Sequence, residues 1–180
     1  MPIKVQIPKN EYYDESTNTF IETRDTTLVL EHSLVSISKW ESKWHKPFIS
    51  NTDKTFEESI DYIKCMTITQ NVPNEVYYGI TEDLLSSIDS YITDSQSATW
   101  FRETQESPSR EVITSELIYY WMIACGIPME CQKWHLNRLL TLIRICNVKN
   151  SPNKKMSSSE LASRNRALNA ARRKQHNTRG

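Results

Sequence analysis

The sequence predicts a mainly helical α+β fold with a small β-hairpin region at the N-terminus. Two observations carry this prediction. Apolar residues alternate with polar ones within residues 3–30, whereas from Ser33 onward they recur every three or four positions, as on one face of a helix. The chain also contains only 3 Gly, too few for the many tight turns of an all-β fold. Its 180 residues are enough for one domain and a terminal extension.

Short apolar runs near the N-terminus predict the strands. The polar stretch 14–19 separates two aromatic-rich runs, which is typical of a hairpin loop. The period-2 runs that we expect to form strands are Ile3–Ile7, Tyr12-Tyr13, Phe20-Ile21 and Thr27–Leu30.

Capping and breaking residues delimit the helices that follow. The first begins after Ser33 and ends before Pro47, because the residue preceding a proline is disfavoured in a helix. Thr55 and Glu58 form a capping box for the second. Thr81, followed by two acidic residues that suit the helix dipole, begins the third. Segment 93–110 is polar and is predicted to be a loop. The side chains expected to be buried in these helices are Leu34, Ile37, Trp40, Trp44, Phe56, Ile60, Ile63, Leu84, Leu85 and Ile88.

The last two helices of the body are predicted to form an antiparallel helical hairpin over 114–147. Thr114 or Ser115 caps the first of them, and Gly126 closes it. Pro128 opens the second, which runs to about residue 147 and is the most apolar helix of the chain. Because the link between them is short, we expect the two helices to pack against each other at the centre of the core.

Residues 151–180 differ in composition from the body, 1–150. They hold eight Lys or Arg against one acidic residue, a net charge of +7, which leaves the body with 14 basic and 21 acidic residues, a net charge of −7. Met156, Leu161 and Leu168 are their large apolar residues, too few to repay the entropy of folding alone. The capping box at Ser157 and Glu160 precedes good helix formers. We expect a mobile basic tail that becomes helical on a partner.

Cysteine usage and the absence of apolar spans predict a cytosolic chain. None of the four cysteines lies in a CxxC pair, and all fall in apolar helical patterns, so we expect buried free thiols in a reducing compartment. The N-terminus lacks the charged-then-apolar pattern of a secretory signal. No apolar run approaches the ~20 residues that span a membrane, so no membrane partner is expected. The cysteines are Cys65, Cys125, Cys131 and Cys146.

Catalytic and metal-binding patterns are absent from the sequence. Cys131 and His135 would share a helix face, but a tetrahedral zinc site needs three or four ligands and no second pair accompanies them. No signature places a thiolate at a helix start beside a base. The chain contains no GxSxG, Walker A, GxGxxG or HExxH sequence. We therefore predict no catalytic residue, no metal, no cofactor and no enzymatic activity.

Three segments, 38–44 (SKWESKW), 127–144 (IPMECQKWHLNRLLTLIR) and 164–173 (RNRALNAARR), carry a family resemblance. They resemble tail assembly chaperones of long-tailed, siphovirus-like bacteriophages. The resemblance implies a non-enzymatic role in virion morphogenesis in the host cytoplasm. Such chaperones bind the long tape measure protein and help tail tube subunits polymerise around it, and they usually leave before the tail is complete.

Partner binding is predicted for two groups of residues. The basic tail would engage the tape measure protein, the tail tube protein or another copy of the chain. The body would contribute tryptophans, since tryptophan is enriched at interface hot spots. The predicted contact residues are Trp40, Trp44, Trp134 and Arg138 on the body and Arg164, Arg166, Arg172, Arg173 and Lys174 in the tail.

Two alternatives stay open at this point. The chain could be a permanent structural component of a phage tail or baseplate, which would share the same surfaces. A nucleic-acid-binding regulator acting through the basic tail rests on charge alone, because the tail has no aromatic residue to stack on bases. Nucleic acid is therefore the less favoured partner.

Overall fold

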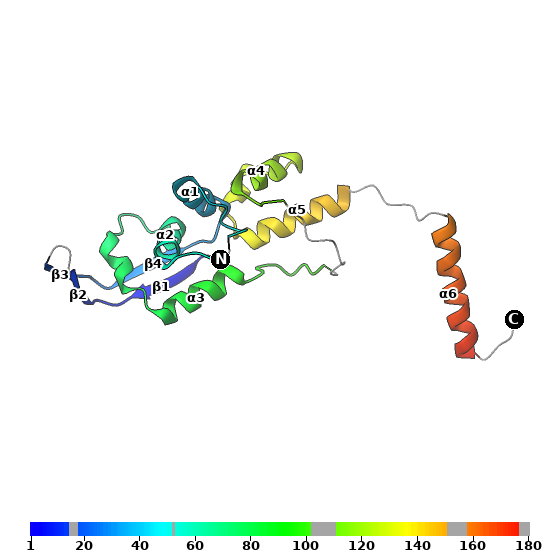
Figure 1. Ribbon diagram of the computed structural model, residues 1–180, viewed down its shortest axis with the longest axis horizontal. Coiled ribbons are helices and arrows are strands. Elements are labelled where there is room, and N and C mark those ends of the chain that lie inside the picture. The colour runs from blue at the N-terminus through cyan, green and yellow to red at the C-terminus, as the bar shows by residue number, and fades with distance from the viewer. Residues whose placement is uncertain (15–17, 52, 102–110, 151–157, 177–180) are drawn as a thin grey trace. The chain divides into compact units, whose positions relative to one another are not determined.

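The computed structural model confirms a mainly helical α+β fold with antiparallel strands at the N-terminus (Figure 1). It forms two compact units, Met1–Asn147 and Val148–Gly180. The structure describes the whole chain except residues 15–17, 52, 102–110, 151–157 and 177–180. In chain order, the elements are β1 (Ile3–Ile7), β2 (Glu11–Asp14), β3 (Thr19–Glu22), β4 (Thr26–Leu30), α1 (Leu34–Trp44), α2 (Phe56–Met66), the 3₁₀ helix η1 (Asn74–Gly79), α3 (Glu82–Thr93), α4 (Ser115–Ala124), the 3₁₀ helix η2 (Met129–Lys133), α5 (Leu136–Asn150) and α6 (Ser158–His176).

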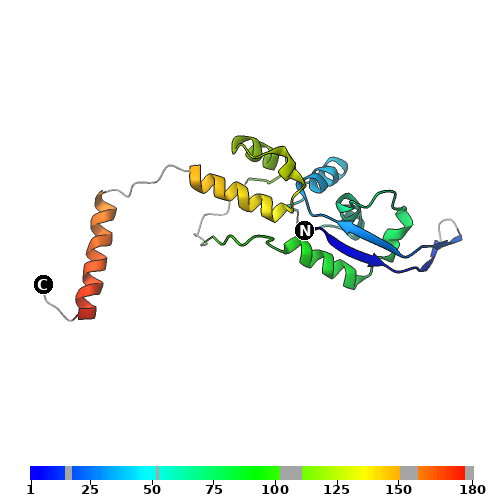
Figure 2. The same cartoon turned by 180° about the vertical axis from the view of Figure 1, so that it is seen from behind.

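The strands form two antiparallel pairs, and all four predicted strands are confirmed. β1 pairs with β4, with Val5 opposite Leu28, and β2 pairs with β3 across the expected hairpin loop. Alternation places Val5, Ile7, Leu28 and Leu30 in the interior, as the period-2 pattern requires. α3 packs against β1 (Figures 1 and 2). The small sheet is therefore covered by a helix and contributes one wall of the core.

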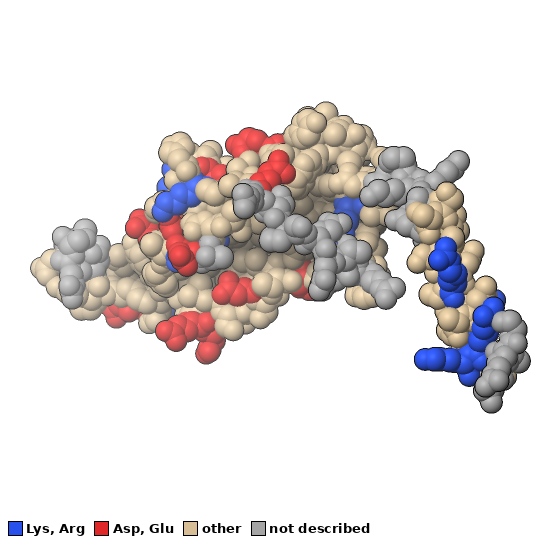
Figure 3. Space-filling model, turned by 45° about the vertical axis from the view of Figure 1, so that its right-hand side comes forward, with Lys and Arg blue, Asp and Glu red and all other residues tan. Residues whose placement is uncertain are grey.

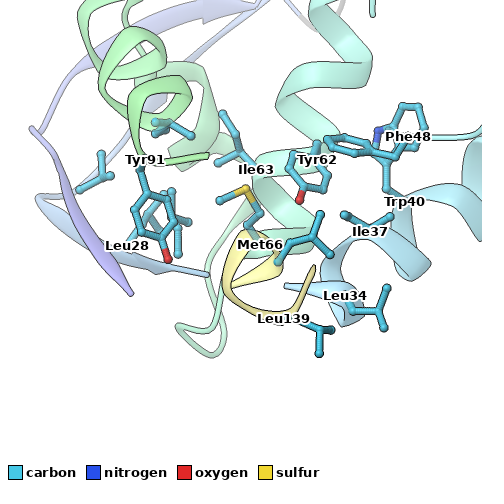
Figure 4. Packing of buried hydrophobic residues seen from close by; sticks show 14 of the residues in the cluster. Leu28, Leu34, Ile37, Trp40, Phe48, Tyr62, Ile63, Met66, Tyr91 and Leu139 are labelled. Carbon is cyan, nitrogen blue, oxygen red and sulfur yellow. The ribbon is translucent and has the colours of Figure 1, made fainter. Parts of the chain in front are cut away.

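Side chains of α1 and α2 supply the middle of the core (Figure 4). Ile37 and Trp40 of α1 face Tyr62 and Met66 of α2, and Phe48 from the intervening loop lies 3.9 Å from Tyr62, measured between ring centroids. All five side chains are buried. Burying an aromatic or large aliphatic side chain contributes about 1.5–3 kcal/mol, so this cluster provides much of the folding energy.

The predicted caps are present at the helix starts that the structure describes. Thr55 and Glu58 form the predicted capping box, in which the Thr55 hydroxyl accepts from Glu58 N–H and the Glu58 carboxylate accepts from Thr55 N–H at 2.8 Å. Thr81 and Thr114 cap α3 and α4. Gly126, with φ of +66°, closes α4, since this left-handed conformation suits glycine. The predicted cap of the tail helix, at Ser157, lies outside the described residues.

The N-terminal residue of α2 differs from the prediction. Phe56 was expected on the buried stripe but is 68% exposed, whereas Ile63 two turns later is buried. The spacing of four and three residues is compatible with one face. Spacing fixes the side of the helix on which Phe56 lies, but it does not show whether another segment covers that side at the first turn.

The predicted antiparallel hairpin over 114–147 is wrong in its connection. Both helices exist, but the second begins at Leu136, because Pro128 opens the short 3₁₀ helix η2 and not α5. The thiol of Cys125, at the end of α4, lies 3.5 Å from Asn147 Oδ1, near the end of α5. The start of α5 is held elsewhere, because Leu136 N–H donates to His32 C=O at 2.7 Å. The segment between the helices, including η2, therefore runs back along them. The sequence pattern shows that Gly126 ends α4, but it gives no sign of the hydrogen bond between Leu136 and His32.

The second unit contains α6, which is the helix expected in the basic tail. Every described side chain of α6 is exposed except that of Ala162, which is half-buried. In proteins, most of the stability of a helix comes from packing its apolar face against other elements. The surface of α6 is therefore available to another molecule.

Candidate partner-binding surfaces

Trp40 is a core residue and not a contact residue. Its side chain is 0% exposed, and its indole N–H donates to the Glu58 carbonyl at 2.9 Å. The prediction that Trp40 binds a partner is wrong for the folded chain. Helical spacing placed it on an apolar stripe, and only the position of α2 decides that this stripe faces inward.

Trp44 lies at the rim of the same stripe and is half-buried. Its ring stacks on Trp40 with centroids 6.2 Å apart, and its indole N–H donates to Asp61 Oδ2 at 2.9 Å. Lys43 Nζ bonds the other oxygen of the same carboxylate at 2.5 Å. Trp44 is thus fixed by α2, and only part of its side chain is accessible to a partner.

Trp134 and Arg138, which the sequence analysis names as partner-contact residues, form a pair at the surface of the body. Trp134 caps η2 and is 36% exposed, and Arg138 lies one turn later in α5. The Arg138 guanidinium carbon is 4.4 Å from the centre of the indole ring. A guanidinium over an aromatic ring is a cation–π contact worth about 0.5–1 kcal/mol at exposed sites. The contact therefore preorganises a flat, cationic surface on the body.

The outer face of α4 is a second exposed apolar surface, which the sequence analysis missed. Tyr120 is 64% exposed and Ile123 is 69% exposed, while Ile118 and Met122 on the opposite side are buried. The available signal was that α4 is apolar on every side, which for a short helix indicates contacts on more than one face.

The β2–β3 hairpin presents a smaller aromatic group that was also missed. The rings of Tyr13 and Phe20 lie 5.0 Å apart between centroids, and both are more than half exposed. Tyr12 contacts exposed Tyr78 of η1 edge-on at 6.4 Å. Exposed aromatic clusters of this kind are typical of protein contact sites.

The predicted tail residues all lie on α6 and are exposed (Figure 3). Because successive positions of a helix advance around its axis, these cations surround α6 and do not form one stripe. Cations arranged in this way favour a partner whose surface is acidic, because the attraction does not depend on a close fit of shapes. The residues are Arg164, Arg166, Arg172, Arg173 and Lys174.

The interior holds a hydrogen-bonded cluster of titratable side chains between the strands and the helices. His32 Nδ1 lies 2.5 Å from the Tyr62 hydroxyl, and the rings of His32 and His135 are 5.1 Å apart between centroids. The Tyr91 hydroxyl donates to Glu31 at 2.5 Å. Burial raises the pKa of both tyrosines, so both hydroxyls stay protonated.

Both histidines in this cluster are neutral at pH 7. Burial, with a smaller contribution from His135, lowers the pKa of His32 to about 3. His135 Nε2–H donates to the Tyr91 carbonyl at 3.0 Å, while Nδ1 accepts from Asn137 N–H, so the ring has one donor and one acceptor. Burial also lowers the pKa of His135. A pair of neutral, enclosed imidazoles serves packing here and cannot act as a cationic site.

Acid is expected to destabilise the fold through His32. In the unfolded chain, His32 binds a proton below its ordinary pKa of 6.5, whereas in the folded chain it binds one only below about pH 3. The free energy of unfolding therefore falls as the pH decreases through this range. Urea titrations at about pH 7 and about pH 5 should differ by roughly 2 kcal/mol, at about 1.36 kcal/mol per pH unit for one proton. His32→Gln should reduce this difference, and equal stability of the wild type at both pH values would refute the assignment.

The cavities and thiols do not assemble a nucleophile or a metal site within the described part of the chain. A cavity of about 380 Å³ is lined by Glu31, Lys39, Cys65 and Lys133, among others. Burial raises the pKa of Cys65, so it is a thiol and not the reactive thiolate. Among described residues, no group of three His, Cys, Asp or Glu could hold a metal ion. Of the four free cysteines, only Cys131 is buried; the others are half-buried.

In the described parts of the chain, each helix is too short or too polar to cross a bilayer. No protein-family model, curated protein or solved structure matches this chain.

Proposed function

We propose that this protein is a non-enzymatic tail assembly chaperone of a long-tailed bacteriophage, which binds the tape measure protein and promotes assembly of the tail tube. The observation that carries the proposal is α6, a helix of 19 residues in a unit of its own, with nearly all of its described surface exposed. A helix of this kind gains stability only when another molecule covers it. The resemblance of residues 38–44, 127–144 and 164–173 to these chaperones supports the choice of partner.

The body complements the tail with surfaces suited to protein contacts. The Trp134–Arg138 pair and the outer face of α4 combine aromatic, aliphatic and guanidinium groups. Aromatic residues and arginine dominate interface energetics. A chaperone with two separate contact elements can hold a long, helical client reversibly, because each contact contributes to the total affinity.

Co-purification tests the proposal directly. The chain is co-expressed with the tail tube protein and with a tagged tape measure protein encoded beside it. Deletion of residues 151–180 should abolish capture, and Trp134→Ala should weaken it about 30-fold, the equivalent of about 2 kcal/mol at a hot spot. Phe56→Ala, which removes another exposed aromatic ring from the body, serves as the matched control. Circular dichroism verifies that each variant keeps its folded body. Capture that survives the tail deletion would exclude α6 as the contact element.

Mass spectrometry of purified virions separates the chaperone from a permanent tail or baseplate component. A chaperone should be missing from the particle, whereas a structural component should be present in a fixed number of copies. Either result leaves the co-purification experiment interpretable, because both roles require partner binding.

A further inference from the structure

Two stripes with the same spacing lie on α6. Leu161 and Leu168, which are 46% and 45% exposed, are seven residues apart and hence on the same side of the helix. Arg166 and Arg173 are also seven residues apart and exposed. At about 100° per residue, the arginine stripe lies about 140° around α6 from the leucine stripe, so the arginines can face an acidic surface while the leucines point away from it.

The outward face of α3 offers such a surface. α3 carries Glu82, Asp83 and Asp89 and contains no Lys, Arg or His. Among the described residues, none of these three carboxylates forms an ion pair. This face forms a shallow, open groove that is lined by α3 alone, at Glu82, Leu85, Ser86, Asp89, Ser90 and Thr93.

The groove and the tail helix match in spacing as well as in charge. Glu82 and Asp89 are seven residues apart on one face of α3, as are Arg166 and Arg173 on one face of α6. The match extends to the whole chain, because the tail carries a net charge of +7 and the body a net charge of −7. Figure 3 shows acidic side chains distributed over the visible face of the body and basic ones along α6.

We propose that the chain associates with itself head to tail, with α6 of one copy docked in the α3 groove of a second copy. This inference rests on the proposed function in one respect, that α6 is the partner-binding element, and it names the partner that occupies α6 before a client arrives. Because the two surfaces differ, the contact is heterologous and can close into a ring or continue into a chain. A client that binds α6 then competes with the neighbouring copy.

Salt dependence provides the first test, on the full-length protein alone. Light scattering coupled to size-exclusion chromatography at about 0.1 M NaCl should give masses that rise with concentration above the monomer mass of 21.1 kDa. At about 1 M NaCl, where the Debye length falls from roughly 10 Å to roughly 3 Å, the protein should be monomeric. A monomer at both salt concentrations overturns the proposal. So does salt-dependent compaction without a change in mass, since it would mean that the tail docks on its own body.

Charge reversal identifies the two surfaces. Arg166→Glu with Arg173→Glu turns the arginine stripe of α6 acidic and lowers the net charge of the tail from +7 to +3, and Glu82→Lys with Asp89→Lys makes a basic groove. Each variant should associate at least about tenfold more weakly than the wild type, because like charges then face each other. Glu57→Lys with Glu130→Lys is the matched control, since it changes the net charge equally at exposed positions outside α3. This control should associate nearly as well as the wild type, and a loss equal to that of the groove variant would overturn the assignment to α3.

Mixing the two variants gives the sharpest test. The tail variant retains an acidic groove, and the groove variant retains the arginine stripe of α6, so the mixture should associate although each component alone does not. Failure of the mixture to associate, with both components folded by circular dichroism, contradicts the proposal. These measurements contain no client. Loss of self-association with intact capture of the tape measure protein would therefore refute this inference alone, and loss of capture with intact self-association would refute the proposed function alone.

Discussion

Replacing Trp40 by alanine is expected to lower the free energy of unfolding by about 3–5 kcal/mol, the range for removal of a buried aromatic side chain. Trp40 is fully buried, stacks on Trp44, and meets Phe48 edge-on with ring centroids 5.1 Å apart. Its indole N–H is also the hydrogen-bond partner of the Glu58 carbonyl. The substitution would leave a cavity between α1 and α2 and would remove this bond. Because domains of this size are stable by only about 5–15 kcal/mol, the variant should be close to unfolding.

Urea denaturation followed by circular dichroism measures this loss without relying on tryptophan fluorescence. Trp100→Ala is the control, because Trp100 is 81% exposed and its removal should change stability by less than about 0.5 kcal/mol. Trp40→Phe keeps a ring in the site but not the N–H, so its loss should be intermediate. Equal stability of the Trp40 and Trp100 alanine variants would contradict the placement of Trp40 in the core.

Glu41→Ala is expected to cost about 2–6 kcal/mol, because it leaves two buried backbone N–H groups without an acceptor at about 1–3 kcal/mol each. Oε1 of Glu41 accepts from Phe48 N–H, and Oε2 accepts from Ser115 N–H, both at 2.7 Å. Glu41 is 8% exposed and Ser115 is fully buried. One carboxylate thus ties α1 to the loop that follows it and to the first turn of α4, 74 residues later.

Hydrogen exchange shows whether this link exists. The amide of Ser115 should exchange slowly in the wild type and much faster in Glu41→Ala, with the global stability measured in parallel. Glu41→Gln should lose less stability than alanine, since its amide oxygen can still accept one of the two bonds. Glu57→Ala, at an exposed position of α2, controls for the removal of a negative charge. Unchanged protection of Ser115 in the alanine variant would contradict the structure at this point.

The sequence by itself determined the type of most elements and several of their ends. Alternation predicts β1 to β4, and three- and four-residue spacing predicts the helices, because these periods follow from backbone geometry alone. The cap at Thr55 with Glu58 and the stop at Gly126 are equally local, since each satisfies backbone groups within a few residues. Charge composition alone also separated the tail from the body.

Long-range contacts decided what the patterns could not. Trp40 and Trp134 each follow a lysine, yet one is enclosed by α2 and the other lies at the surface beside Arg138. The sequence pattern places Glu41 on the polar side of an amphipathic helix. Only the packing of Ser115 beside it makes its carboxylate a buried hydrogen-bond acceptor. The return of the chain between α4 and α5 depends in the same way on the bond from Leu136 to His32. Local periodicity fixes which side of a helix is apolar, whereas the packing of distant segments fixes which of its side chains remain free to bind another protein.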